Sequence, residues 1–175
     1  MIKHSQGENP LIFYSNIGTG YTYIKRYVVN KILSEVSNKY KKYRYSCKSY
    51  SGNYIALAFS QNPISCDIAK IDYSGDIGRL EKKMKFFLKE DEIKDVIKSE
   101  DPYKYAIWGF TRKECIYKMY NVRNLKNFDN IVSKHKTIYF NNLIMETQHI
   151  YKDVVLSYIS ESKNRGILQK YEYSI

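Results

Sequence analysis

The segment Trp108-Gly-Phe-Thr-Arg-Lys-Glu-Cys-Ile-Tyr-Lys118 combines helix-forming residues with a charge pair at helical spacing. In a helix, Glu114 and Lys118 stand one turn apart on one face. A neighbouring face that can pack on a core carries Trp108, Thr111, Cys115 and Met119. We therefore expect a helix that holds a carboxylate and an ammonium group above a core. The alternative is an ordinary surface pair that contributes roughly 0.2–0.5 kcal/mol and has no chemical role.

A second carboxylate lies about forty residues upstream, in the apolar stretch Ile64-Ser-Cys-Asp-Ile68. This stretch has the length and residue types of a buried strand, and Asp67 is its only charged residue. Two acidic groups from a strand and a helix, placed beside a lysine, suit a hard divalent cation that holds a phosphate. The sequence thus predicts that Asp67, Glu114 and Lys118 meet in one site.

The composition indicates a globular protein with an anionic partner. Of 175 residues, 43% are hydrophobic, and 29 Lys and Arg against 18 Asp and Glu give a net charge of +11. Such an excess fits nucleic acid, a membrane surface, a phosphorylated cofactor or an acidic protein. The three cysteines have no C-x-x-C spacing, so we expect them to be reduced. Without a long apolar run or an apolar N-terminal segment, we expect no membrane span and a cytoplasmic location.

Hydrophobic periodicity and turn residues predict an α+β fold. Strands are expected over residues 11–14, 54–59, 64–71, 136–140, 142–149 and 154–159, with 54–59 and 64–71 forming an antiparallel hairpin. Helices are expected over residues 21–36, 77–88, 91–98 and 108–120. Residues 38–44 are a basic connection, residues 49–53 a turn, and residues 161–175 a loosely ordered tail. The element order suggests two halves of similar build, residues 1–75 and 76–175.

Four short motifs occur in an order and at spacings that together are fairly specific. They are Ser49-Tyr-Ser-Gly52 before a strand, Ser65-Cys-Asp-Ile-Ala69 within one, Phe86-Phe87 before the acidic run 90–92, and Trp108 followed by Lys113-Glu114 and Lys118. This set resembles the 4'-phosphopantetheinyl transferases, in particular their surfactin-type branch. The resemblance spans roughly residues 45–160. It implies two pseudo-symmetric halves, each with a helix packed on a small antiparallel sheet, in a monomer with the active site between the halves.

The resemblance also implies an activity. An enzyme of this family moves the 4'-phosphopantetheine arm of coenzyme A to a serine of an apo carrier protein and releases 3',5'-bisphosphoadenosine. The partner is then an acidic acyl or peptidyl carrier domain of fatty acid, polyketide or nonribosomal peptide synthesis. The reaction depends on Mg²⁺, with Mn²⁺ as the alternative ion. Neither nucleic acid nor a membrane is an expected partner.

Roles for individual residues follow from the resemblance. Asp67 and Glu114 would hold the metal, and Glu114, or a water that it orients, would take the serine proton. Lys118, assisted by Lys113, would neutralise the pyrophosphate. Ser49 and Tyr50 would hydrogen-bond phosphate oxygens. Candidates for the 3'-phosphate and adenine side are Lys25, Arg26, Lys39 and Arg44.

Two departures from the family pattern keep other functions open. Ala69 stands where the surfactin-type branch has a second metal-binding carboxylate, and Tyr50 stands where it has a histidine. One alternative is therefore a degenerate homologue that binds coenzyme A or a carrier without turnover. Another is a basic nucleic-acid-binding module in which Glu114 is incidental.

Overall fold

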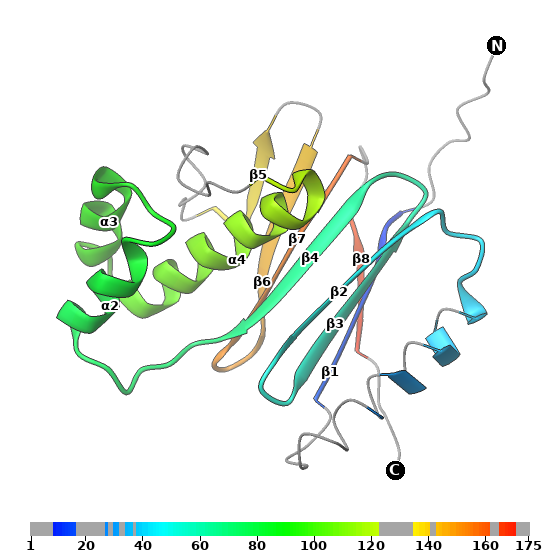
Figure 1. The fold of residues 1–175 in the computed structure, drawn as a ribbon, viewed down its shortest axis with the longest axis horizontal. Helices are drawn as coiled ribbons and strands as arrows, with labels where there is room; N and C mark the ends of the chain where they lie inside the picture. Colours follow the sequence, from blue (N-terminus) through cyan, green and yellow to red (C-terminus); the bar gives the residue numbers. More distant parts are fainter. Residues whose placement is uncertain are drawn as a thin grey trace.

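The structure is a computed structural model, and it describes residues 9–16, 27, 30–31, 34–36, 38–122, 135–140, 143–161 and 165–170. It has the predicted α+β class (Figure 1). The strands are β1 (Leu11–Asn16), β2 (Tyr45–Ser51), β3 (Tyr54–Ser60), β4 (Ile64–Lys70), β5 (Thr137–Phe140), β6 (Leu143–Tyr151), β7 (Val154–Ser160) and β8 (Ile167–Lys170). The helices are α2 (Ile77–Met84), α3 (Glu90–Ile97) and α4 (Pro102–Tyr120). In the described part of the chain, no helix is long and apolar enough to cross a membrane.

The strands form two sheets with the orders β2-β3-β1-β8 and β4-β7-β6-β5. The pairs are antiparallel except for β1 and β8, which run parallel. The order β2-β3-β1 in the first sheet recurs as β6-β7-β4 in the second. The expected division of the chain into residues 1–75 and 76–175 stays a prediction.

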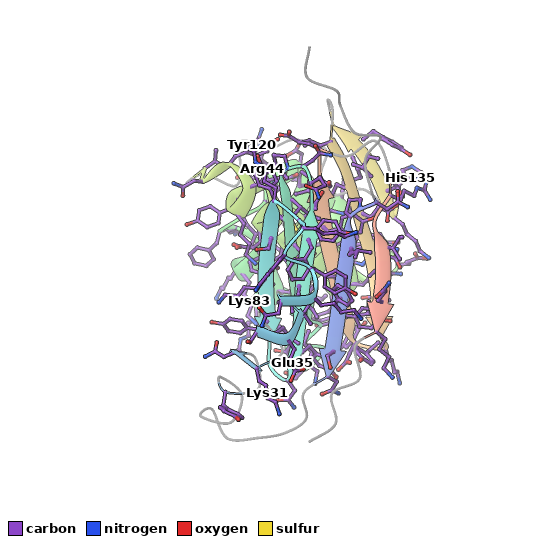
Figure 2. The ribbon with its side chains drawn as sticks, turned by 90° about the vertical axis from the view of Figure 1, so that its right-hand side faces the viewer. Lys31, Glu35, Arg44, Lys83, Tyr120 and His135 are labelled. Atoms are coloured by element: carbon purple, nitrogen blue, oxygen red, sulfur yellow. The ribbon has the colours of Figure 1, made fainter. Side chains whose placement is uncertain are left out.

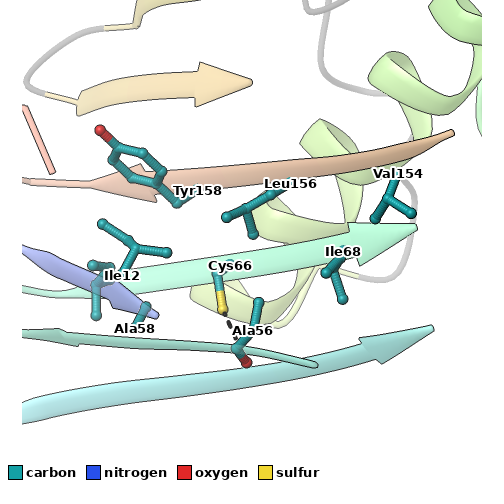
Figure 3. Packing of buried hydrophobic residues seen from close by; sticks show 9 residues of the cluster. Ile12, Ala56, Ala58, Cys66, Ile68, Val154, Leu156 and Tyr158 are labelled. Carbon is teal, nitrogen blue, oxygen red and sulfur yellow. Dashed lines mark hydrogen bonds between the residues drawn. The ribbon is translucent and has the colours of Figure 1, made fainter. Parts of the chain in front are cut away.

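Alternation along β4 fixes the layers of the fold. Ile64, Cys66 and Ile68 face the first sheet and pack against Ala56 and Ala58 of β3 (Figure 3). The intervening positions of β4, including Asp67, face the opposite way. Helix α4 covers that second face, where Thr111 Oγ1 lies 2.7 Å from Ser157 Oγ of β7. A strand buried on both faces therefore carries the acid that the sequence analysis singled out.

The expected hairpin of residues 54–59 and 64–71 is wrong. Strand β3 pairs with β1 on one side and β2 on the other, so neither of its edges is open to β4. Strand β4 instead crosses to the second sheet and pairs with β7. Two strands were not expected at all: β2, of which residues 49–51 were expected to be in a turn, and β8, which lies in the expected loose tail.

The helix ends follow the local sequence signals. Asp76 caps α2 by accepting a hydrogen bond from the Arg79 amide at 2.8 Å. Helix α4 begins at Pro102 behind its cap Asp101, which is six residues before the expected start. It ends at Asn121 in a left-handed conformation, φ 53°. The helix expected over residues 21–36 lies largely outside the described residues, although residues 34–36 are helical.

Gly166 directly precedes β8, where this strand joins the first sheet. A side chain at this position is expected to lower the stability of the fold. A Cβ at this position would overlap Ile12 Cδ1 and lie 2.9 Å from Tyr158 Cζ. Because both neighbours are buried, Gly166→Ala is expected to lower the free energy of unfolding by about 1–3 kcal/mol. Urea denaturation measures it. Gly75→Ala is the control, since its Cβ would make an ordinary 3.7 Å contact. Equal stability of the two variants would contradict the prediction.

Candidate functional site

A cavity of about 390 Å³ lies where β2, β4 and α4 meet. Strand β2 contributes Lys48, Ser49, Tyr50 and Ser51, strand β4 contributes Asp67, Ile68 and Ala69, and α4 contributes Phe110, Glu114 and Lys118. Five of the residues predicted from sequence thus line one cavity: Ser49, Tyr50, Asp67, Glu114 and Lys118. They come from positions up to 69 residues apart, from Ser49 to Lys118.

Helix α4 presents a regular stripe to the cavity. Phe110, Glu114 and Lys118 are spaced by four residues, so each lies one turn above the last. The neighbouring face of α4 is buried, as the sequence predicted, and Trp108, Thr111 and Cys115 are each at most 2% exposed. This packing fixes the rotation of α4 about its axis. The stripe is therefore held rigidly toward the cavity.

Asp67 and Lys118 form the closest ion pair of the site. Lys118 Nζ donates to Asp67 Oδ1 at 2.6 Å and also to the backbone carbonyl of Cys66 at 3.2 Å. Ser49 Oγ donates to the same Asp67 oxygen at 2.7 Å. The Asp67 side chain is 8% exposed and that of Lys118 27%, so the lysine reaches solvent through the cavity.

The carboxylates of the site resist ionisation. Burial raises the pKa of Asp67 more than Lys118 and Ser49 lower it. Burial, and then the negative charge of Asp67, raise the pKa of Glu114. For Lys118, burial disfavours the charged form, but the charge of Asp67 and the hydrogen bond to it outweigh this and raise the pKa. The ammonium group is thus charged at neutral pH, and the two acids would gain from a further cation between them.

The donor set fits a magnesium ion with a phosphate ligand. Among the described residues, Glu114 has no hydrogen-bond partner, whereas Asp67 accepts hydrogen bonds from Ser49 and Lys118 through Oδ1. No group of three or more His, Cys, Asp or Glu that could hold a metal occurs within those residues. A site of two carboxylates nevertheless suits Mg²⁺, which keeps several waters and binds through one or two carboxylates plus substrate phosphates. Asp67 and Glu114 are the residues that would hold it.

A ladder of side-chain hydrogen bonds joins β2 to β4 along the cavity. The amides of Cys66, Ile68 and Lys70 donate to the side chains of Cys47, Ser49 and Ser51, at 3.4, 3.3 and 3.3 Å. The backbone amides along this edge of β4 therefore have hydrogen-bond acceptors, although no described strand pairs with this edge through its backbone. The single proton of Ser49 points to Asp67, so this hydroxyl positions Asp67. The expected role of Ser49 as a donor to phosphate oxygens does not fit this arrangement.

Ser49→Ala is expected to lower the free energy of unfolding by about 1–3 kcal/mol. The change removes the donor to buried Asp67 and leaves the buried Ile68 amide without its acceptor. Urea denaturation measures the loss. Ser46→Ala on the exposed face of the same strand is the control and should stay within about 0.5 kcal/mol of the parent. If Ser49→Ala is as stable as Ser46→Ala, Ser49 does not support the Asp67 strand.

The thiol of Cys47 belongs to the same ladder and was not singled out from the sequence. A hydrogen bond with the Cys66 thiol lowers the pKa of Cys47 to about 6, against the effect of burial, with help from the Cys66 amide and Ser65. The hydrogen bond with Cys47, and then burial, raise the pKa of the Cys66 thiol. All three cysteines are free, as the sequence predicted. The pKa of Cys47 is therefore lower than that of an ordinary thiol.

Two other residues of the quoted motif lie away from the cavity. Lys113 is fully buried and donates to Glu92 Oε2 at 2.6 Å, so it is an internal ion-pair residue and not the expected assistant to Lys118. Trp108 is also buried, and its Nε1 lies 3.3 Å from His149 Nε2. The aromatic residue of α4 that reaches the cavity is Phe110, which the sequence analysis missed. Its position four residues before Glu114 was the available signal.

The remaining candidates lie outside the cavity. Lys25 and Arg26 fall outside the described residues. Lys39 and Arg44 are exposed and do not line the cavity, whereas Lys48, which was not predicted, does. Figure 2 shows Arg44 at the same end of the molecule as Tyr120, with Lys31 at the opposite end. Because Tyr120 ends α4, Arg44 lies toward the Lys118 end of the cavity.

The chain matches no protein-family model, and no curated protein shows significant sequence similarity to it.

Proposed function

We propose that this protein is a 4'-phosphopantetheinyl transferase, which moves the phosphopantetheine arm of coenzyme A to a serine of an apo carrier protein. The observation that carries the proposal is the meeting of Asp67, Glu114 and Lys118 in one cavity. These are the residues to which the motif resemblance assigns metal binding, proton transfer and pyrophosphate binding. A basic module that binds nucleic acid does not need two carboxylates beside a lysine.

The charges of the site suit displacement at a pyrophosphate, which needs neutralisation and alignment more than covalent help. A magnesium ion held by Asp67 and Glu114 would supply Lewis-acid stabilisation of the phosphate oxygens. Lys118 adds a fixed positive charge, because Asp67 and the Cys66 carbonyl hold its ammonium group in place. Ser49 orients Asp67 in turn.

Glu114 is the residue placed to accept the proton of the attacking serine, directly or through a water. It has no hydrogen-bond partner among the described residues, so its carboxylate is available. Its raised pKa makes it a better base than an ordinary surface glutamate, because a group accepts a proton most effectively when its pKa approaches the working pH. Burial beside Asp67 is the cause of that increase.

Positive charge continues from the cavity along β2. Lys48 lines the cavity, and the exposed Arg44 stands four residues earlier in the chain, directly before β2. This row suits the phosphates at the nucleotide end of coenzyme A. The net charge of +11 also favours association with an acidic carrier protein by electrostatic steering.

Intact-mass analysis of several apo carrier proteins, incubated with this protein, coenzyme A and Mg²⁺, tests the proposal. The expected result is a gain of about 340 Da, the mass of one transferred arm, that EDTA abolishes. Binding of coenzyme A without a gain on any carrier would instead favour a homologue without turnover. Neither binding nor transfer would overturn the proposal.

A nucleic-acid-binding function is the second candidate, and one observation favours it. Three cations lie over neighbouring tyrosine rings before and at the start of β2: Lys39 over Tyr40 at 5.6 Å, Lys42 over Tyr43 at 5.2 Å and Arg44 over Tyr45 at 5.3 Å. Interleaved cations and aromatic rings are typical of single-strand binding. Tight, salt-dependent oligonucleotide binding without magnesium-dependent binding of coenzyme A would favour this candidate.

A further inference from the structure

Two of the three free cysteines lie against each other on neighbouring strands. The sulfur of Cys47 on β2 is 3.4 Å from the amide nitrogen of Cys66 on β4 and 3.7 Å from the carbonyl oxygen of the same residue. The Cys66 sulfur is in turn 3.7 Å from the Cys47 carbonyl oxygen. A disulfide needs Cα atoms within about 7 Å of each other. Because each sulfur contacts the backbone of the other residue, the two cysteines form such a close pair.

The two thiols differ in their access to solvent. Cys47 is half-buried, so part of it is open to small molecules. Cys66 is fully buried, and its side chain points from β4 toward the Ala56 carbonyl of β3 (Figure 3). A small oxidant from solvent therefore reaches Cys47 first, and Cys66 reacts only through Cys47.

The surroundings of Cys47 favour its reaction with an oxidant. A hydrogen bond with Cys66 is the largest of the effects that lower the pKa of Cys47 to about 6, and the nearby Ser65 hydroxyl and the positive charge of Lys118 act in the same direction. A cysteine reacts through its thiolate, so a lowered pKa makes more of the reactive form available. The position of Cys47 beside a second thiol then offers its oxidised sulfur an immediate partner.

The third cysteine has a different setting. Cys115 of α4 is fully buried, and its sulfur donates to the Ser157 carbonyl of β7 at 3.4 Å. Burial raises the pKa of its thiol. Helix α4 covers the opposite face of β4 from the one that carries Cys66. Cys115 is therefore an internal reference for an unreactive thiol.

We propose that Cys47 and Cys66 are an oxidisable pair, in which Cys47 reacts with a peroxide and Cys66 then closes a disulfide between β2 and β4. With hydrogen peroxide, the Cys47 sulfur attacks one oxygen, the O–O bond breaks, and a sulfenic acid and one water form. The Cys66 sulfur then displaces the hydroxyl group from Cys47, and this group leaves as a second water with the Cys66 proton. The two thiols are oxidised by two electrons, and the peroxide is reduced to two waters.

The pair lies directly beside the candidate site. Cys66 precedes Asp67, and its carbonyl oxygen accepts a hydrogen bond from Lys118 at 3.2 Å. Cys47 stands two residues before Ser49, which donates to Asp67. A disulfide therefore acts on the backbone that holds Asp67 and Lys118 in place. The chemistry of the pair is independent of the proposed transferase function.

Peptide mapping of the whole protein, treated with hydrogen peroxide and then blocked with N-ethylmaleimide, tests the proposal. Trypsin cleaves after Lys48, which lies between the two cysteines, so the disulfide joins peptides 45–48 and 49–70. The expected result is this linked species, which dithiothreitol separates, and a decrease of about 2 Da in the intact mass before blocking, for two lost hydrogen atoms. Cys115 should remain free.

Single variants separate the roles of the thiols. Cys47→Ser is expected to slow the peroxide-dependent loss of thiols by about tenfold or more, because the accessible sulfur is gone. Cys66→Ser should stop at the sulfenic acid on Cys47, which dimedone traps. Cys115→Ser is the matched control for a buried cysteine, and it should oxidise like the parent.

Three free thiols in the parent after peroxide treatment would overturn the proposal, as would a disulfide that joins two chains through Cys47. If Cys66→Ser fails to fold by circular dichroism, the peptide map of the parent carries the test. Failure of the transfer assay would not affect the result, because thiol mapping uses neither coenzyme A nor a carrier protein.

Discussion

Glu114→Gln is expected to reduce the rate of phosphopantetheine transfer by about 10²–10⁴-fold. The amide keeps the shape of the side chain but cannot accept the serine proton, and it removes one of the two charges available to a metal. Because Glu114 has no hydrogen-bond partner among the described residues, unfolding free energy should change by no more than about 0.5 kcal/mol. Initial rates in the intact-mass assay measure the loss, and urea denaturation checks the fold.

The pH profile gives an independent reading of the same role. A general base must be deprotonated, so parental activity should fall as the pH decreases through the pKa of Glu114, which burial and Asp67 raise above its ordinary value. The control is Glu90→Gln, an exposed acid at the start of α3, which should transfer at the parental rate with the parental profile. Full activity of Glu114→Gln would remove Glu114 from the mechanism.

Local spacing was enough to predict the pair of groups on α4. Glu114 and Lys118 differ by one helical turn, and the apolar residues beside them have the spacing of a buried face. The acid in the stretch 64–68 was equally visible, because a lone charge in an apolar strand needs a partner. These signals depend on residues close in sequence. The sequence therefore predicted the acids and the lysine that line the cavity.

Strand partners were not predictable in the same way. Strand β8 pairs with β1 across about 150 residues, and β4 leaves its sequence neighbour β3 to pair with β7. Hydrophobic periodicity identifies a strand, but it does not indicate which other strand it pairs with. The side chains of Cys47, Ser49 and Ser51 look like turn and loop residues in sequence. They lie in a strand that pairs with β3, and their side chains satisfy the amides of β4.

Lys113 was predicted to assist Lys118, but its position on the helix already indicated a buried side chain. It precedes Glu114 directly, so a helix rotates it about 100° away from the cavity. It shares its face with Gly109 and Ile116, which are both buried. An acid was therefore needed for it on a neighbouring element. Glu92 of α3 fills this role, and its second oxygen, Oε1, has no hydrogen-bond partner among the described residues.

Lys113→Met is expected to lower the free energy of unfolding by about 3–5 kcal/mol, because it leaves the Glu92 carboxylate buried without its cation. Among the described residues, Glu92 keeps the hydrogen bond from the Lys89 amide, which caps α3. The double variant Lys113→Met/Glu92→Gln should recover much of the loss, since a neutral amide can keep that cap without a buried charge. Lys82→Met, on the exposed side of α2, is the matched control and should be near neutral.

The same variants separate the two lysines of the motif by function. At a temperature where Lys113→Met is fully folded, it should transfer at a rate close to the parental one, because Lys113 does not line the cavity. Lys118→Met should behave in the opposite way, with a large loss of transfer, because its side chain is part of the cavity and faces the pyrophosphate in the proposed reaction. If Lys113→Met loses transfer while folded and binding coenzyme A normally, the buried pair with Glu92 must also set the position of Glu114, one residue further along α4.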